Sequence, residues 1–313
     1  MTLEPLRKPE WIRLKVPSGK NYTHVKQTLR FLELHTVCNE ARCPNISECW
    51  GMGTATIMIM GSTCSRGCRF CSVNSGKPGP LERQEPENVA IAIEKWGLRY
   101  VVITSVCRDD LEDGGADHIA RTIKAISVKC PWTVVEALIP DFHGSEDSLD
   151  KVVSANPRVI SHNIETVARL SPKVRDFRAS YEQSLMVLEK IKELNPAIYT
   201  KSSLMLGLGE TEQEVISTMK DLKSRNVSIL TMGQYLQPSS RHLPVIQYVT
   251  PERFDWFAQV AKQIGLSFVV SGPMVRSSYR AGEFFLQTKF ENISDMNHRN
   301  QDVSRRFPAS GIS

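Results

Sequence analysis

Short apolar runs alternate with longer amphipathic stretches along most of the chain. The apolar runs carry few charges, which predicts strands buried on both faces of a sheet. They occupy residues 55–60, 100–106, 132–139, 157–163, 198–206, 227–232 and 266–271. The amphipathic stretches predict helices at residues 86–96, 116–128, 145–155, 181–194, 211–225 and 251–264.

Helix-start signals agree with this periodicity. Glu85 and Glu87 lie at the start of the first predicted helix, where acidic side chains favour the helix dipole. Thr211 and Glu214 have the spacing of a capping box. Side-chain chemistry therefore supports the predicted helix starts independently of the apolar pattern.

The regular alternation of strands and helices predicts βαβ units and a parallel sheet. We expect an α/β fold, a partial (β/α)6 TIM-type barrel with N-terminal and C-terminal extensions covering the barrel mouth. The predicted divisions are residues 1–53, 54–271 and 272–313. Glycine and polar residues follow the predicted strands, which is where a (β/α) barrel carries its catalytic face.

Composition and charge narrow the class of protein. The chain has 313 residues and a formal net charge of +5, from 39 basic and 34 acidic residues. This excess is too small and too dispersed to predict nucleic-acid binding. No apolar run approaches the roughly 20 residues that span a bilayer, and the N-terminus has no apolar signal region. We therefore expect a cytoplasmic protein with no membrane or nucleic-acid partner.

The eight cysteines indicate metal binding or catalysis rather than disulfides in a chain without a secretory signal. Cys64, Cys68 and Cys71 follow the 55–60 strand with C-x3-C-x2-C spacing. Three thiolates on one flexible loop suit a [4Fe–4S] cluster with one iron open to a small molecule. The alternatives are a structural zinc loop, although zinc usually takes four protein ligands, and three unrelated core cysteines.

Another triplet, which comes first along the chain, is Cys38, Cys43 and Cys49, with C-x4-C-x5-C spacing. Pro44 and the glycines at 51 and 53 argue against a regular helix there, so we expect a loop that wraps a second cluster. A single six-cysteine site is the alternative, but the strand at 55–60 would hold the triplets apart. For Cys107 and Cys130, which stand alone, we expect free thiols.

The first thirty residues form a basic, proline-containing arm, with one short helix predicted near residues 24–29. The arm is either a solvated extension or a docking surface for an acidic protein.

Several motifs together resemble the lipoyl synthase family of the radical S-adenosylmethionine (SAM) superfamily. Phe70 before the last cysteine of C-x3-C-x2-C is typical of that superfamily. The resemblance covers nearly the whole chain. Its motifs are the two cysteine triplets, PNISECWG at 44–51, TATIMIMG at 54–61, RDDLEDGGA at 108–116, HNIETV at 162–167, LMLGLGET at 204–211, QYLQPS at 234–239, HLPV at 242–245, YVTPE at 248–252 and VRSSYRA at 275–281.

This resemblance implies an enzyme, a sulfurtransferase that inserts two sulfur atoms at C6 and C8 of a protein-bound octanoyl-lysine. It implies two [4Fe–4S] clusters and SAM as cofactors. Cys64, Cys68 and Cys71 would hold the cluster that binds SAM. Cys38, Cys43 and Cys49, with Ser278 of the RSSY motif, would hold an auxiliary cluster that supplies sulfur. Capping of a helix by Ser277 and Ser278 is the alternative for that motif.

Polar residues at the predicted strand ends are candidates for binding SAM. By analogy with the superfamily, Asn163 and Glu165 are the first choices. Arg108, Asp109 and Asp110 are expected near the same mouth. The full set of candidates is Thr104, Ser105, Asn163, Glu165, Lys201, Gly209, Glu210 and Gln234. The chain departs from the family pattern at Cys107, where Asp or Asn is expected, and at Gln247, where a basic residue is expected.

The resemblance also implies partners. The substrates would be octanoylated lipoyl carrier domains, namely 2-oxoacid dehydrogenase E2 subunits and the glycine cleavage H protein. A low-potential electron donor (ferredoxin or flavodoxin) and an iron–sulfur cluster carrier protein would also be needed.

Two other functions stay open at this point. One is another sulfur-inserting radical SAM enzyme, such as a methylthiotransferase, although we expect no room for its usual C-terminal domain after residue 271. The other is a non-enzymatic metal protein that binds nucleic acid through the basic arm, which the βα rhythm argues against.

Overall fold

One eight-stranded sheet organises the residues that the computed structural model describes, which are 6–13 and 19–278. Its strand order is β1-β2-β5-β6-β7-β8-β9-β10, and the pairs from β2 onward are all parallel. The strands are His35–Thr36 (β1), Ile57–Ile59 (β2), Tyr100–Ser105 (β5), Val134–Leu138 (β6), Val159–Ser161 (β7), Tyr199–Leu206 (β8), Ile229–Gln234 (β9) and Phe268–Gly272 (β10). β1, at one end of the order, runs antiparallel to β2.

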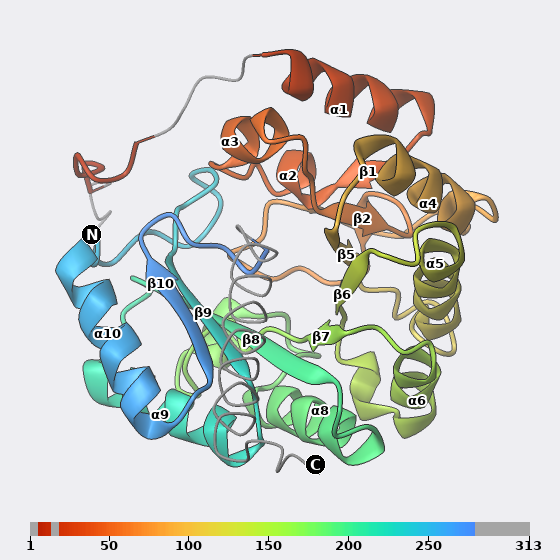
Figure 1. The fold of residues 1–313 in the computed structure, drawn as a ribbon. Helices are drawn as coiled ribbons and strands as arrows, with labels where there is room; N and C mark the ends of the chain where they lie inside the picture. Colours follow the sequence, from red (N-terminus) through yellow and green to blue (C-terminus); the bar gives the residue numbers. More distant parts are fainter. Residues whose placement is uncertain (1–5, 14–18, 279–313) are drawn as a thin grey trace, which may run out of the picture. The chain divides into compact units, whose positions relative to one another are not determined.

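Helices follow the parallel strands and cover the outside of the sheet (Figure 1). They are Glu85–Trp96 (α4), Ala116–Lys129 (α5), Glu146–Ser154 (α6), Tyr181–Leu194 (α8), Glu212–Ser224 (α9) and Pro251–Ile264 (α10). Because β10 is not paired with the strands at the other end of the order, the barrel is open. The predicted α/β class and partial TIM-type barrel are confirmed.

Local sequence signals place the helix ends within about one residue of the prediction. Thr211 and Glu214 form the expected capping box, with each side chain accepting from the other's main-chain N–H. Ser145, Ser180 and Thr250 cap the starts of α6, α8 and α10. The buried strands β2, β7 and β9 match the continuous apolar runs that predicted them.

The N-terminal region is more helical than predicted. Lys20–Phe31 (α1) extends beyond the expected short helix, and two further helices, Val37–Glu40 (α2) and Ile46–Gly51 (α3), carry cysteines of the first triplet. The interpretation of this segment as an irregular loop was therefore wrong. Each helix is short enough to avoid Pro44, which lies between them, and α3 ends at Gly51.

Other short elements escaped the periodicity argument because they span too few residues to show a period. These are Thr63–Cys64 (β3), Asn74–Ser75 (β4), Phe142–Gly144 (η1) and Ser171–Val174 (α7). β3 and β4 pair with each other in a separate two-stranded sheet. Both lie in the segment that carries the second cysteine triplet.

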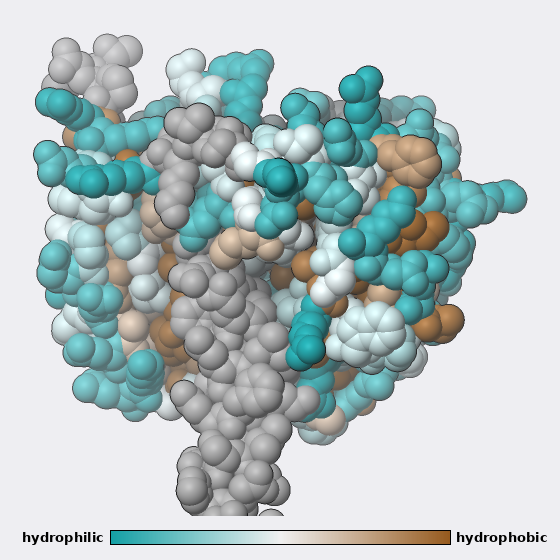
Figure 2. Space-filling model, turned by 45° about the horizontal axis from the view of Figure 1, so that its top comes forward, coloured by the Kyte–Doolittle hydropathy of each residue, from teal (hydrophilic) through white to brown (hydrophobic). Residues whose placement is uncertain are grey.

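The described residues belong to one compact unit that ends at Tyr279. A second unit begins at Arg280 and lies outside the described residues. The predicted divisions at 53/54 and 271/272 stay predictions. None of the helices in the described part is long and apolar enough to cross a membrane. On the face drawn in Figure 2, hydrophilic side chains predominate and apolar ones are scattered among them.

A buried ion pair crosses the interior of the sheet. Lys201 on β8 donates to both carboxylate oxygens of Glu136 on β6, at 2.8 and 3.0 Å. Tyr100 on β5 and Ser161 on β7 each donate a hydroxyl hydrogen bond to Glu136 at 2.6 Å. Both charged side chains are almost completely buried. Four neighbouring strands are thus joined through one carboxylate.

We expect Lys201→Met to lower the free energy of unfolding by about 3–5 kcal/mol, because the Glu136 carboxylate would be left buried without its cation. Adding Glu136→Gln should recover at least half of this loss, since the amide oxygen still accepts hydrogen bonds and carries no charge. Denaturant unfolding of the single and double variants tests this. A double variant that is less stable than Lys201→Met would contradict the charge argument.

Candidate functional site

A cavity of about 510 Å³ lies at the carboxyl ends of the parallel strands. It collects residues from nearly every part of the described chain. Its lining includes both cysteine triplets (Cys38, Cys43, Cys49 and Cys64, Cys68, Cys71), Cys107, Thr104, Ser105, Asn163, Glu165, Gln234, Ser277 and Ser278. A cavity therefore lies where the residues that follow the strands predicted a catalytic face.

The C-x3-C-x2-C loop is closed at its base by the β3–β4 pair. Gly76 N–H donates to the main-chain oxygen of Cys64 at 2.9 Å, and Cys71 N–H donates to that of Cys68 at 3.0 Å. Ser75 also donates its hydroxyl hydrogen bond to the main-chain oxygen of Arg66 at 3.0 Å. The loop therefore has a defined conformation that presents its three thiols to the cavity.

Main-chain N–H groups point at the sulfurs of this loop. Arg66 and Cys107 each donate to Cys64 Sγ at 3.4 Å, and Asp176 donates to Cys68 Sγ at 3.3 Å. Such bonds stabilise a thiolate. A hydrogen bond from the Cys107 thiol lowers the pKa of Cys64 to about 6. Burial raises the pKa of Cys68 to about 11 and that of Cys71 to about 12.

The other triplet is carried by α2, by the turn after it and by α3. Cys38 lies in α2 and Cys49 in α3, and Cys43 N–H donates to the main-chain oxygen of Cys38 at 3.0 Å. Burial, together with the charge of neighbouring cysteines, raises the pKa of Cys38 to about 11 and that of Cys49 to about 12. These thiols are hard to ionise unless a cationic centre binds them.

The segment after β10 reaches the first triplet. Asn45 Nδ2 donates to the main-chain oxygen of Met274 at 2.7 Å. Gly233 on β9 permits this approach, because a Cβ there would lie 2.0 Å from the main-chain oxygen of Val275. Beyond that contact, Ser277 and Ser278 line the cavity. Two parts of the chain that lie far apart in sequence therefore form one wall.

The donor set of each triplet fits an iron–sulfur cluster. The charges of Cys38 and Cys43 help to raise the pKa of Cys49. Those of Cys68 and Cys64 help to raise the pKa of Cys71. The cysteines of each triplet are therefore close to one another. Within the described residues, no three His, Cys, Asp or Glu side chains converge on a point where one metal ion would sit. Cubane ligands bind different irons and stand farther apart than ligands of one ion.

Several of the predicted SAM contacts line the cavity with unsatisfied polar atoms. Ser105 Oγ and Asn163 Oδ1 are buried and have no hydrogen-bond partner. Glu165 has a φ of 66°, which is unusual for a residue with a side chain. Burial raises the pKa of the Glu165 carboxyl. A polar ligand that reaches these atoms would satisfy them.

Other residues predicted to contact SAM form bonds with protein groups instead. Lys201 is outside the cavity lining and pairs with Glu136, and Glu210 accepts from the N–H groups of Gly207 and Leu208. Gly209 is also outside the lining. Gln234 lines the cavity, but its amide bonds to the main chain of Tyr235, Gln247 and Val249. The structure therefore does not bring Lys201, Gly209 or Glu210 to the candidate SAM site.

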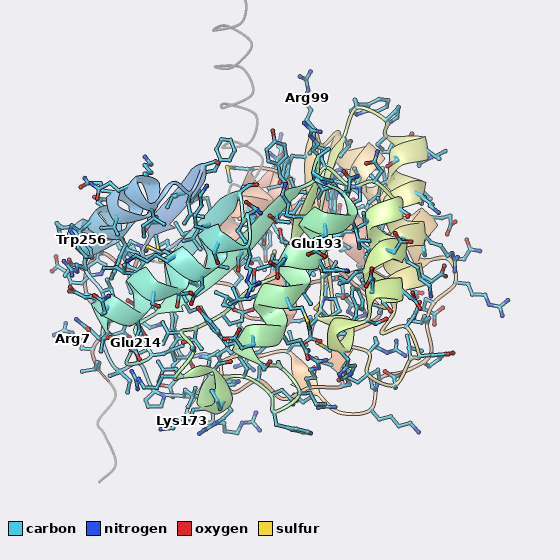
Figure 3. All side chains as sticks on the ribbon, turned by 90° about the horizontal axis from the view of Figure 1, so that it is seen from below. Arg7, Arg99, Lys173, Glu193, Glu214 and Trp256 are labelled. Atoms are coloured by element: carbon cyan, nitrogen blue, oxygen red, sulfur yellow. The ribbon has the colours of Figure 1, made fainter. Side chains whose placement is uncertain are left out.

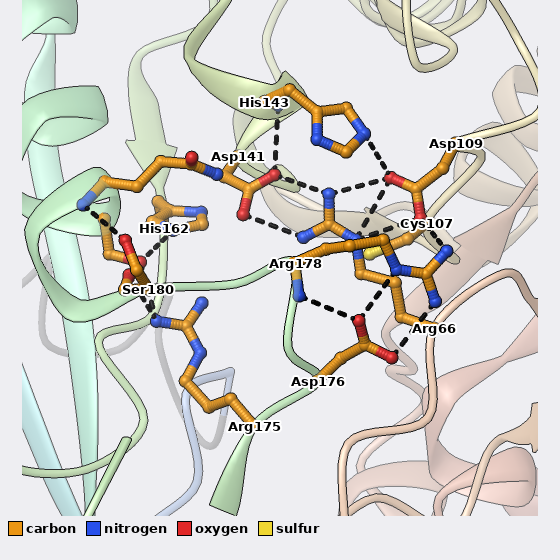
Figure 4. A network of polar contacts seen from close by, with 12 residues as sticks. Arg66, Cys107, Asp109, Asp141, His143, His162, Arg175, Asp176, Arg178 and Ser180 are labelled. Atoms are coloured by element: carbon orange, nitrogen blue, oxygen red, sulfur yellow. Dashed lines mark hydrogen bonds and ion pairs between the residues drawn. The ribbon is translucent and has the colours of Figure 1, made fainter. Parts of the chain in front are cut away.

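Sequence reasoning missed the ionic network around Arg66, which lies between Cys64 and Cys68 (Figure 4). The guanidinium of Arg66 is buried and pairs with Asp109 at 2.7 Å and with Asp141 at 2.8 Å. Asp176 accepts from Gly67 N–H at 2.8 Å and pairs with Arg178 at 2.8 Å. The predicted mouth residue Asp109 thus anchors the cysteine loop, and it is absent from the cavity lining.

Arg108, which precedes Asp109 in the RDDLEDGGA motif, also forms a structural ion pair. Arg108 pairs with Asp110 at 2.8 Å and donates to the main-chain oxygen of Gly79 at 2.9 Å, and neither Arg108 nor Asp110 lines the cavity.

The two lone cysteines differ in environment. Cys130 is a fully buried free thiol, as expected, whereas Cys107 lies in the cavity beside Cys64. Its position two residues after Ser105, the last residue of β5, was the available signal.

Comparisons with known families agree with this arrangement. Residues 58–222 match the model of the radical SAM superfamily. Residues 2–43 match the model of the N-terminal domain of lipoyl synthase of the radical SAM family.

Curated relatives are similar over nearly the whole chain. The chain is 54% identical to mitochondrial lipoyl synthase from Rattus norvegicus, over 91% of this chain and 78% of the relative. It is 54% identical to the mitochondrial lipoyl synthase of Schizosaccharomyces pombe, over 92% and 80%. It is 52% identical to apicoplast lipoyl synthase from Plasmodium vivax, over 92% and 65%.

Solved structures share the fold at low sequence identity. Streptococcus suis SuiB bound to S-adenosylmethionine has a TM-score of 0.53 and 8% identity, over 72% of this chain and 53% of that one. HydG, a maturase of the [FeFe]-hydrogenase, has a TM-score of 0.52 and 14% identity, over 81% and 68%.

The Arg66 network gives an expected pH dependence. Burial alone would raise the pKa of Asp141, but the hydrogen bonds and charge of Arg66 lower it to about 2, below the ordinary 3.8. Its stabilising effect is therefore complete above pH 3.8 and is lost as the pH falls toward 2. At neutral pH, Asp141→Asn should lower the free energy of unfolding by about 2 kcal/mol.

Urea unfolding of wild type and Asp141→Asn, in the same iron-free form at each pH, tests this expectation. The difference should stay constant from about pH 8 to 5 and shrink below about pH 4. Asp255→Asn, on the exposed face of α10, is the matched control and should have little effect. A difference that is unchanged at the lowest pH would show that Asp141 stabilises the fold by some means other than its charge.

Proposed function

The chain belongs to the lipoyl synthase family of the radical SAM superfamily, and from this premise we propose how its residues carry out the reaction. The proposed reaction inserts two sulfur atoms at C6 and C8 of an octanoyl group on a carrier-protein lysine. The observation that carries the proposal is the cavity lined by both cysteine triplets and Ser278. A radical SAM enzyme with one cluster needs only Cys64, Cys68 and Cys71. Sulfur insertion explains why the cavity has three further cysteines, Cys38, Cys43 and Cys49.

In this proposal Cys64, Cys68 and Cys71 hold a [4Fe–4S] cluster with one iron open to SAM. When bound and reduced, that cluster supplies the electron that splits SAM into methionine and a 5′-deoxyadenosyl radical, which takes hydrogen from carbon. The main-chain N–H groups of Arg66, Cys107 and Asp176 hold the thiolates in the required charge state. Ser105 and Asn163 orient SAM through polar atoms that lack protein partners, and Glu165 and Thr104 line the cavity beside them.

We assign Cys38, Cys43, Cys49 and Ser278 to the auxiliary [4Fe–4S] cluster, the sulfur source. A serine oxygen is a harder and weaker ligand for iron than a thiolate. That difference suits a cluster that must give up sulfur. The hydrogen bond from Asn45 to Met274 supports the assignment, because it holds the serine segment beside these cysteines.

The cavity wall suits an apolar acyl chain. Apolar side chains line it from opposite sides of the barrel, among them Met58, Leu138 and Leu204. The octanoyl chain has no acidic hydrogen, so no general base is required of the protein. The residues act by excluding water and by keeping the reacting carbons near the bound cofactors.

The proposed partners follow from this reaction. The substrates are octanoylated domains of the 2-oxoacid dehydrogenases and of the glycine cleavage H protein. A ferredoxin or flavodoxin supplies electrons, and an iron–sulfur carrier protein rebuilds the consumed cluster. The curated relatives are named lipoyl synthases, which does not favour a methylthiotransferase. Those reported above are named as mitochondrial or apicoplast proteins, so they give no support to the predicted cytoplasmic location.

Iron and sulfide content after anaerobic reconstitution tests the two-cluster assignment. We expect about eight iron atoms per chain in the wild type and about four when either cysteine triplet is replaced by alanine. The Cys38/Cys43/Cys49 variant should still form 5′-deoxyadenosine but no lipoyl product from an octanoylated carrier. The proposal fails if the wild type binds one cluster only, or cleaves SAM without making lipoyl product.

The basic arm offers a second test. Arg7, Lys8 and Arg13 are exposed, and Lys8 also lines the cavity. Lys15 of the same arm lies outside the described residues. Reversing these four charges should raise the KM for an acidic carrier about tenfold at low ionic strength, because electrostatic steering is lost. An unchanged KM, measured with a saturating chemical reductant, would refute the docking role of the arm.

A further inference from the structure

The cysteine loop has a second face, which points away from the cavity. Cys64, Cys68, Phe70 and Cys71 line the cavity, but Gly67 and Arg69 do not and are exposed to solvent. The loop is therefore a thin wall between the cavity and the surface.

Two other segments pack against this outer face. Arg69 N–H donates to the main-chain oxygen of Val174 at 2.9 Å, and the Arg69 side chain donates to the main-chain oxygen of Lys173 at 3.3 Å. Leu243 N–H donates to the main-chain oxygen of Arg69 at 3.3 Å, and His242 Nε2 lies 3.0 Å from the main-chain oxygen of Cys71. Residues 171–178 and 239–243 thus surround the loop.

Together these segments present a cationic patch with one aromatic residue. Arg69, Lys173 and Arg241 are exposed, and none forms an ion pair with another residue of the described ranges. The three segments contain a single acidic residue, Asp176, and Arg178 neutralises it. We call Arg69, Lys173, Arg241 and Phe177 the Phe177 patch.

Phe177 is unusual for its exposure. Its side chain is 88% exposed, more than any other large apolar residue in the described part of the chain. The Arg178 guanidinium lies 5.0 Å from the centroid of its ring and is itself hydrogen-bonded to Asp176 and the main-chain oxygen of Ser65. An exposed aromatic ring within a cationic surface is typical of a protein–protein contact.

The patch is connected directly to a cluster ligand. Phe177 follows Asp176, whose main-chain N–H donates to Cys68 Sγ at 3.3 Å. One peptide bond and one hydrogen bond therefore separate an exposed residue from a sulfur of the SAM-binding triplet. Figure 3 shows Lys173 of the patch at the opposite end of the barrel from Arg99, which precedes β5. The patch therefore lies at the catalytic end.

We propose that the Phe177 patch is the docking site for the acidic, one-electron donor protein that reduces this enzyme. The inference rests on the function proposed above and adds where the electron enters. The donor loses one electron and is oxidised, and the site held by Cys64, Cys68 and Cys71 gains it. Unpaired cations complement an acidic donor, and docking here puts the donor near Cys68. The carrier domain must instead deliver its acyl chain through the cavity.

Direct binding to the anaerobically reconstituted enzyme tests the proposal, with a flavodoxin as the probe. Lys173→Glu with Arg241→Glu should weaken the affinity about tenfold at low ionic strength, and the loss should shrink as salt screens the charges. Arg69 is left unchanged because its main chain forms part of the cysteine loop. The matched control is Arg99→Glu with Lys262→Glu, two exposed cations outside the patch, which should bind as the wild type does.

Phe177 is tested separately, with Trp132 as its matched control. Phe177→Ala should weaken flavodoxin binding about fivefold. Trp132→Ala removes another exposed aromatic side chain, 62% exposed and situated before β6, and should have no effect. Because both side chains are largely exposed, neither change should alter folding or iron content.

Turnover separates this inference from the proposed function. Formation of 5′-deoxyadenosine driven by dithionite should be unchanged in the patch variants, while the flavodoxin-driven rate falls. Absence of turnover in the wild type with dithionite would count against the proposed function. The flavodoxin-binding measurements would still test the docking site in that case. Flavodoxin binding that is equal in patch and control variants would overturn the inference. So would weaker binding of the octanoylated carrier with unchanged flavodoxin binding.

Discussion

The buried guanidinium of Arg66 is the interaction on which the arrangement of the site depends. It lies between two cysteines of the C-x3-C-x2-C loop and is held by carboxylates that follow β5 and β6. A buried cation with two anionic partners restricts the conformation of the loop far more than a surface ion pair would. Loss of either partner would leave a charge buried without solvation. The loop is therefore fixed to the barrel by electrostatics before any cofactor is considered. Its glycine and serine content alone would have left it flexible.

The first triplet, Cys38, Cys43 and Cys49, also depends on partners that lie far away in sequence. Short helices carry these cysteines, and their conformation is stabilised locally by Thr36, which caps α2. Their place in the cavity, however, depends on the segment after β10, which approaches through Gly233 and bonds to Asn45. Parallel topology makes this possible, because all carboxyl ends of the strands meet at one end of the barrel. The candidate site is thus assembled by the fold as a whole.

Much of this could be predicted from sequence because the information is local or periodic. The apolar runs specify the parallel strands, and the Thr211–Glu214 pair specifies a helix start. Cysteine spacing indicates the two groups of ligands. What could not be predicted are pairings between residues far apart in sequence, such as Arg66 with Asp141. Lys201 illustrates the opposite error, since a polar residue in a strand was taken for a ligand contact when it balances a buried carboxylate. Pro44 misled for another reason, because a proline between two short helices breaks neither.

The hydrogen bond from Asn45 to Met274 also has a consequence for biogenesis. A ribosome synthesises the cysteines of the first triplet early and the serine segment more than two hundred residues later. On a nascent chain, the wall that both segments form cannot close until the segment after β10 has been synthesised. The C-x3-C-x2-C loop has its partners between residues 65 and 243, all synthesised before the serine segment, and so can reach its final shape earlier. The surroundings of the two cysteine triplets are therefore completed in a fixed order, set by the direction of protein synthesis.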